Sequence, residues 1–468
     1  MSDIFKTKPI DVLLRESKGE GGKDKSLRKV LGSFELTMLG IGAIIGTGIF
    51  VLTGVAAAKY SGPALVLSFI VAGAACTFAA LCYAEFAAMV PVAGSAYTYG
   101  YTALGEIWAW IIGWDLILEY TVAIAAVAIG WSGYIVSLLQ SAGINLPTAL
   151  VNPIGVTGGF INLPAIIIIG LISALLIRGV KESAAINNII VAIKIAVVLL
   201  FIAIGAFHIH PSNWSPFLPF GWNGVFQGAA IIFFAYIGFD AVSTAAEEVK
   251  NPQKDLPRGI IGSLIVCTIL YIVVSGILTG MVPYLKFKNT SAPVAYALQQ
   301  IGINWGSALV SVGAVCGITS VLLVMTFGQT RVFFAMSRDG LLPKVFGKVH
   351  PKFGTPAKST LMVGAVTALL AGFTPIADVA ELTNIGTLAA FIIVSIAVIV
   401  LRRKRPDLKR TFRCPWTPVL PALSVVFCLY LIYVLPTVTH IRFVVWLIVG
   451  LAVYFLYSKH HSVLTAGR

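Results

Sequence analysis

Hydrophobic residues in this chain form long stretches that short polar segments interrupt. The stretches are about 20 residues long, which is the length a helix needs to cross the hydrocarbon core of a bilayer. The pattern predicts an all-α polytopic membrane protein with twelve membrane-spanning helices. The predicted spans begin near Leu36, Ala64, Ile107, Leu163, Ala184, Val225, Ile260, Ser307, Thr360, Ile385, Val419 and Phe443.

The basic residues predict the orientation of these spans. With the N-terminus in the cytoplasm, the loops near 178–188, 247–258, 330–358 and 402–415 lie inside, together with both tails. The outside loops then hold only four basic residues, Lys59, Lys286, Lys288 and Arg442. Because lysine and arginine accumulate on the cytoplasmic side of membrane proteins, we expect a multi-pass protein of the cell membrane with both termini cytoplasmic.

Composition agrees with this interpretation and narrows it. The chain is 58% hydrophobic and 11% charged, with a mean hydropathy of +0.92, far more apolar than a soluble domain. The net charge of +14 follows from the orientation of the loops, so we expect membrane lipid rather than nucleic acid as a partner. The six cysteines are scattered, without the spacing of a metal site or disulfide framework, and we expect no metal or cofactor.

The segment "GIGAIIGTGIF" at 40–50 places four glycines inside the first apolar stretch. It approaches a dinucleotide-binding fingerprint, but no acidic residue lies between Glu35 and Glu85, where that motif needs one. A second interpretation is a packing face, with Gly42 and Gly46 forming a GxxxG motif. A third is a helix interrupted in mid-membrane, whose freed backbone groups bind a solute.

The third interpretation predicts a second interrupted helix, because carriers of this kind consist of two inverted repeats. The sixth predicted span contains "GAAIIFFAYIGFDAVSTAAEE", with Gly238 and Asp240 in mid-run. Each candidate interruption lies in the first helix of a five-span set. This correspondence favours a carrier over a simple packing motif.

Several further segments complete a family resemblance. They are "YAEFAAMVPVAGSAYTY" at 83–99, "GWDLILEY" at 113–120, "FFAYIGFDAVSTAAEEVKNPQKDLPRGI" at 233–260 and "TRVFFAMSRDGLLP" at 330–343. With the glycine-rich segment they resemble the amino acid–polyamine–organocation transporters, in the bacterial branch related to cationic amino acid transporters.

The resemblance implies a LeuT-like fold of two inverted five-helix repeats and proton-coupled amino acid uptake. The repeats would cover 34–210 and 211–403, with two further helices in 404–458 and cytoplasmic tails at 1–33 and 459–468. No obligate protein partner is evident.

The resemblance also implies a substrate site made mostly of backbone. The amides of Thr47 and Gly48 would meet the substrate carboxylate. The carbonyls of Ile44, Phe234, Ala235 and Ile237 would accept from its ammonium group.

Ionisable residues within a span are costly and therefore candidates for function. Lys194 lies about ten residues, roughly 15 Å, into the fifth predicted span. Burial disfavours its charged form, so it can take up and release a proton during a cycle. The resemblance places this lysine where sodium-coupled relatives hold an ion, in contact with the first helix and the eighth, where Thr319 and Ser320 are the candidates.

Three acids form a second group of candidates. Asp115 and Glu119 lie one turn apart and share a face of the third predicted span, with Glu119 expected to be the deeper. Asp240 follows the second interruption, and the resemblance associates this region with a tyrosine of span seven, here Tyr271. The alternative for these acids is structural hydrogen bonding or a position near the interface.

Met325 of the eighth span faces the substrate side chain, according to the resemblance. Cationic transporters tend to have a smaller residue there, so we expect small neutral amino acids such as alanine to be preferred over arginine. The chain lacks a P-loop, a ring of charges and a cluster of catalytic residues, which disfavours a primary pump, a channel and an enzyme. An amino acid exchanger or a polyamine carrier is the nearest alternative.

Overall fold

A computed structural model describes residues 5–9, 31–90, 95–179, 184–408 and 410–463. All its named elements are helical, which confirms the all-α class. Seven helical segments are long and apolar enough to cross a bilayer: Gly48–Met89, Glu106–Ser141, Asn187–Ala206, Pro252–Met281, Asn304–Arg338, Ile376–Lys404 and Thr437–His461. Four shorter apolar helices join them, so within these residues the chain is a polytopic membrane protein.

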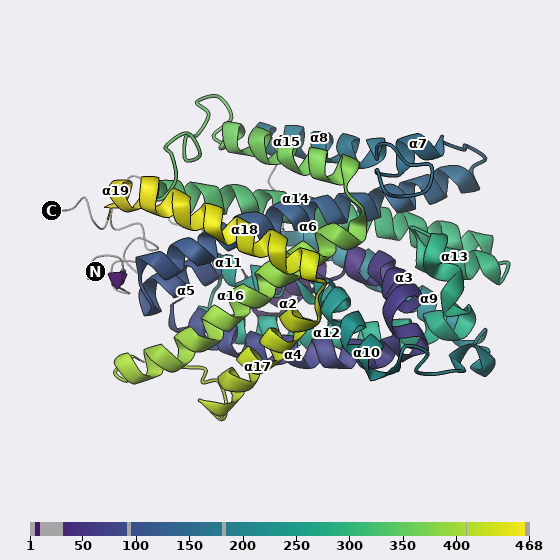
Figure 1. The fold of residues 1–468 in the computed structure, drawn as a ribbon, viewed down its shortest axis with the longest axis horizontal. Helices are drawn as coiled ribbons and strands as arrows, with labels where there is room; N and C mark the ends of the chain where they lie inside the picture. The colour runs from purple at the N-terminus through teal and green to yellow at the C-terminus, as the bar shows by residue number, and fades with distance from the viewer. Residues whose placement is uncertain (1–4, 10–30, 91–94, 180–183, 409, 464–468) are drawn as a thin grey trace.

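Figure 1 shows these elements as one elongated bundle. The principal helices are α2 (Ser33–Ile44), α4 (Leu65–Met89), α5 (Ser95–Ala103), α6 (Glu106–Ser141), α8 (Leu163–Arg178), α9 (Ala184–Ala206), α10 (Gly221–Ile232), α12 (Pro252–Met281), α14 (Asn304–Arg338), α15 (Ala357–Phe373), α16 (Ile376–Lys404), α17 (Val419–Val434) and α18 (Thr437–Val453). Shorter ones are α3 (Thr53–Ala56), α7 (Thr148–Val151), α11 (Ala241–Thr244), α13 (Pro293–Gln300) and α19 (Lys459–His461).

The centre of the bundle consists of α2, α4, α6, α12, α14 and α16, which pack against one another. α8 and α15 pair at one edge (Figure 1), and α17 and α18 lie on the outside of α16. The outer helices expose large apolar side chains, including Leu361 and Leu369 of α15 and Ile441 and Ile448 of α18. Such a continuous apolar exterior suits a lipid environment.

The two described ends of the chain meet at one end of the bundle. Lys8 forms an ion pair with Asp339, the residue that follows α14, at 3.4 Å. The amide of Val463 donates to the carbonyl of the same residue. The first and last described segments therefore lie at the same end of the bundle.

The indole of Trp110 is fully buried and donates to the carbonyl of Gly450. Trp114 stacks on Trp446 with ring centroids 4.5 Å apart. Trp110 and Trp114 lie in the first turns of α6, and Trp446 lies near the middle of α18. Tryptophans at helix ends commonly anchor a protein to the headgroup layer. Here they instead join α6 to α18.

Candidate functional site

Two interrupted helices lie side by side in the centre of the bundle. α2 ends at Ile44, Ile45 is extended with ψ 102°, and helical structure resumes at Gly48. α10 passes into a 3-10 turn at Phe233–Tyr236, after which Ile237 is extended with ψ 136°. Both interruptions occur where the sequence predicts them.

Glycines let the two interruptions touch. A Cβ atom at Gly48 would lie 2.3 Å from the Cα of Ala235. In the other direction, Gly238 has φ +117° and a Cβ there would lie 3.0 Å from the carbonyl carbon of Ala43. Each interruption therefore requires glycine where it meets the backbone of the other.

The other glycines of the first segment have a different role. A Cβ at Gly40 would lie 2.4 Å from Ser263 of α12, and one at Gly42 would lie 2.7 Å from Val191 of α9. At Gly46 the nearest atom, in Val321, is 3.2 Å away. Gly42 and Gly46, the predicted GxxxG pair, thus face two different helices, α9 and α14, and do not form one packing face. Gly48 is instead required by the contact between the two interruptions.

Side chains from distant helices satisfy the carbonyl groups at the end of α2. The last carbonyls of a helix lack intrahelical partners. The Ile41 carbonyl still accepts a backbone hydrogen bond, from the Ile45 amide at 2.9 Å, but two other carbonyls near this end accept from side chains. The Gly42 carbonyl accepts from Lys194 Nζ at 2.7 Å, and the Ile44 carbonyl accepts from Tyr271 Oη at 2.9 Å.

The end of α10 is completed in the same way. Asn384 of α16 donates through its Nδ2 atom to the carbonyls of Ala230 and Ile231, at 2.7 and 2.9 Å. The sequence alone does not identify Asn384 as a functional residue, because a single asparagine in a mostly apolar segment belongs to no recognisable motif. Both interruptions are therefore built into the packing of the bundle.

Tyr271 of α12 connects the two interruptions directly. Its hydroxyl lies 2.9 Å from the Ile44 carbonyl and 2.8 Å from the Ala235 carbonyl. A hydroxyl has one proton to donate, so it can fully satisfy only one of these carbonyls at a time. The other carbonyl remains available to a second donor.

The remaining predicted backbone groups lie around this pair of carbonyls. Thr47 is buried, its hydroxyl lies 3.4 Å from the Val127 carbonyl of α6, and its methyl packs on Gly130. The Phe234 carbonyl accepts from the amide of Ile237 at 3.2 Å, within the 3-10 turn. The Phe234 carbonyl therefore accepts a backbone hydrogen bond of its own. The Ile44 and Ala235 carbonyls instead share the single proton of the Tyr271 hydroxyl.

Lys194 is completely buried on α9 and reaches the end of α2. Its alkyl chain crosses α14 at Gly317, where a Cβ would lie 2.8 Å from Lys194 Cγ. Ser320 donates to the Gly317 carbonyl at 2.9 Å, which places it one turn from this crossing. The hydroxyl of Thr319 instead accepts from the indole of Trp131 at 2.9 Å.

The three candidate acids lie close enough to interact in pairs: Asp115 with Glu119, and Glu119 with Asp240. Glu119 is buried, hydrogen-bonds Thr387 and is close enough to Asp240 for an electrostatic interaction. Asp115 is 1% exposed and Glu119 is 3% exposed, so both carboxylates are buried. Within the described residues neither carboxylate oxygen of Asp115 has a hydrogen-bond partner.

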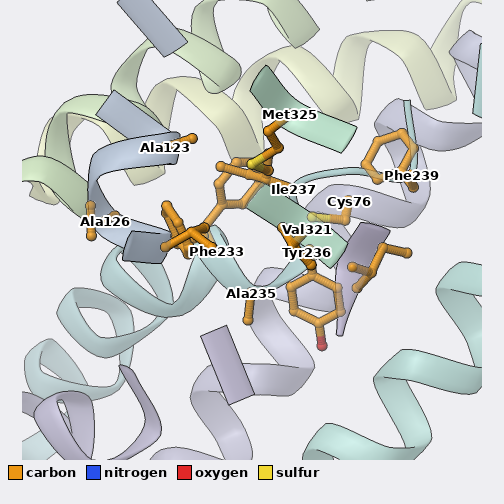
Figure 2. Close-up of a cluster of buried hydrophobic side chains, with 14 of the residues drawn as sticks. Cys76, Ala123, Ala126, Phe233, Ala235, Tyr236, Ile237, Phe239, Val321 and Met325 are labelled. Atoms are coloured by element: carbon orange, nitrogen blue, oxygen red, sulfur yellow. The ribbon is translucent and has the colours of Figure 1, made fainter. Parts of the chain in front are cut away.

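Met325 lies in an apolar cluster beside the second interruption. Its side chain is 8% exposed. Figure 2 shows the side chains that share this cluster, among them Cys76, Ala123, Ala126, Phe233, Ala235, Tyr236, Ile237, Phe239 and Val321. The neighbours drawn around Met325 are hydrophobic side chains, and contact with them suits an apolar group.

Comparisons with known proteins identify the family of this chain. The family model for amino acid permeases matches residues 31–456. The chain is 56% identical to the branched-chain amino acid permease BcaP of Bacillus subtilis, over 98% of both chains. It is 54% identical to the methylthioribose transporter of the same organism, over 99% of this chain and all of that one. It is 40% identical to human cationic amino acid transporter 4, over 81% of this chain and 60% of that protein. The chain belongs to the amino acid permeases of the amino acid–polyamine–organocation superfamily.

Proposed function

We propose that this amino acid permease is a secondary transporter that carries small neutral L-amino acids into the cell together with a proton. The observation that carries the proposal is the pair of touching helix interruptions, with Tyr271 between the Ile44 and Ala235 carbonyls. Twelve spans in a LeuT-like arrangement would place this pair at the membrane midplane, with both termini cytoplasmic in the cell membrane.

The backbone suits the two charges that every free amino acid carries. The Thr47 and Gly48 amides begin the second half of the first helix, where unpaired N–H groups and the helix dipole favour a carboxylate. The carbonyls of Ile44 and Ala235 lie at the ends of the other half-helices and suit an ammonium group. On binding, the ammonium takes one carbonyl and the Tyr271 hydroxyl keeps the other.

The side-chain pocket favours an uncharged substrate. The cluster around Met325 and Ile237 is apolar, and burying a guanidinium there without a partner would be costly. The BcaP relative named for branched-chain amino acids supports a neutral substrate. The equally similar methylthioribose transporter makes a thiosugar the second candidate.

Lys194 carries the coupled proton in this proposal. Its ammonium holds the Gly42 carbonyl and thereby fixes the end of α2 against α9 and α14. Loss of the proton weakens this charge-assisted hydrogen bond and lets α2 move. Proton release towards the cytoplasm then favours an inward-open arrangement, in which the substrate leaves.

Uptake into proteoliposomes tests the proposal. We expect accumulation of labelled L-alanine driven by an inward proton gradient, without sodium and without internal amino acid. A requirement for internal amino acid would indicate an exchanger. Competition with valine, arginine, putrescine and methylthioribose identifies the substrate class. Uptake of labelled methylthioribose without uptake of labelled L-alanine or L-valine would contradict an amino acid substrate.

A further inference from the structure

A groove of about 500 Å³ lies on the surface of α12, near its first turns, and is separate from the transport site. One wall consists of Thr411 and Phe412, from the loop between α16 and α17. The hydroxyl of Thr411 lies 3.0 Å from Gln253 Oε1, so a hydrogen bond joins this wall to α12. The α12 side is lined by Gln253, Lys254, Pro257, Arg258, Ile261, Gly262 and Ile265.

The polar end of the groove holds two available cations. Lys254 and Arg258 are exposed and lie one turn apart. Within the described residues, neither side chain has an ion-pair or hydrogen-bond partner. At the end of α16 and in the loop that follows it, Arg402 binds Glu85 and Arg405 binds Asp407.

The other end of the groove continues as an apolar track. Ile261, Ile265 and Ile269 follow Arg258 at spacings of three and four residues, so they share one face of α12. Ile265 is 54% exposed and Ile269 is 56% exposed. From Arg258 to Ile265 the helix rises about 10 Å, so the change from charged to apolar surface occurs within the groove.

We propose that this groove binds one anionic phospholipid of the cytoplasmic leaflet. The phosphate group lies against Lys254 and Arg258, and the N-terminus of the 30-residue helix α12 adds a favourable dipole. An acyl chain lies along Ile261, Ile265 and Ile269, beside the ring of Phe412. A soluble anion would use only the charged end, whereas a phospholipid matches both ends.

The bottom of the groove connects it to the moving part of the protein. A Cβ at Gly262 would lie 3.2 Å from Thr37 Oγ1 of α2. The proposed lipid site therefore lies against α2, the first half of the first interrupted helix. The proposal does not depend on which substrate is transported.

Native mass spectrometry of the purified full chain tests the proposal. The protein is incubated with phosphatidylglycerol or phosphatidylcholine, and the retained lipids are counted. The test variant K254Q/R258Q is compared with K344Q/K348Q, which removes the same charge from two other exposed basic residues in a predicted cytoplasmic loop.

We expect wild type and K344Q/K348Q to retain phosphatidylglycerol in preference to phosphatidylcholine. K254Q/R258Q should bind it about 30-fold more weakly, as expected for two basic residues at an anionic surface. Phe412→Ala should also weaken retention, and it decides the question if the double variant does not fold. Equal retention by both double variants, an equal loss in both, or no lipid preference in wild type would overturn the proposal.

Discussion

Lys194→Met removes the ammonium group that holds the end of α2 and keeps most of the side-chain volume. The lost interaction is a 2.7 Å hydrogen bond to the Gly42 carbonyl from a fully buried charged group. Hydrogen bonds to charged groups contribute about 1.5–3 kcal/mol. This corresponds to roughly a 10- to 150-fold shift in the equilibrium between a held and a released α2.

We expect the Lys194→Met protein to bind substrate, because the site consists mainly of backbone, but to lose accumulation driven by protons. The assay is uptake into proteoliposomes at matched membrane potential, with and without an inward pH gradient. Lys286→Met is the control, because Lys286 is an exposed residue whose Nζ lies 3.4 Å from Gln300. The reasoning is refuted if Lys194→Met still concentrates substrate when protons flow inward, and the proton would then be assigned to Glu119 or Asp240.

Three further predictions concern the site and one buried ion pair outside it. Gly48→Ala should abolish substrate binding and lower the melting temperature, because the added Cβ would lie 2.3 Å from the backbone of Ala235. Gly46→Ala should be tolerated, because its Cβ would meet only the side chain of Val321, at 3.2 Å. Equal substrate binding by the two variants would show that the close approach of the two interruptions is unimportant. Met325→Ser should widen competition uptake towards arginine and lysine, and an unchanged profile would remove this residue from the pocket. Glu85→Gln should destabilise the protein by about 3 kcal/mol, because a fully buried carboxylate loses its ion pairs; an unchanged melting temperature would contradict that role.

The sequence predicts the helices well because long apolar runs are a local signal. Predicted spans beginning near Leu163 and Val419 begin at those residues in the structure. Other helices begin earlier than their apolar runs: α12 begins at Pro252 and α16 at Ile376. Hydropathy detects the apolar part of a helix, whereas the polar first turns of these helices extend beyond their apolar runs.

Partners across the bundle could not be predicted in the same way. The glycine-rich run signals an interruption, but the hydrogen bond between Lys194 and Gly42 joins residues 152 positions apart. Thr319 illustrates the difficulty. Its position in the sequence predicts a contact with Lys194, but in the structure its hydroxyl accepts a hydrogen bond from the indole of Trp131. Asn384 was missed for the same reason, since only the packed structure brings it to the end of α10.

The proposed function depends on recognition of the substrate by the backbone of two interrupted helices. The most direct test is equilibrium binding of labelled L-alanine to the purified wild-type protein, in competition with three analogues. L-valine retains both charged groups, N-acetyl-L-alanine lacks the ammonium group, and L-alaninamide lacks the carboxylate. We expect L-valine to compete with labelled L-alanine. Each analogue that lacks one charged group should bind at least tenfold more weakly than L-alanine, because it leaves buried backbone groups of the site without a partner. Competition by N-acetyl-L-alanine or L-alaninamide as strong as that of L-alanine itself would contradict recognition of the substrate by the backbone.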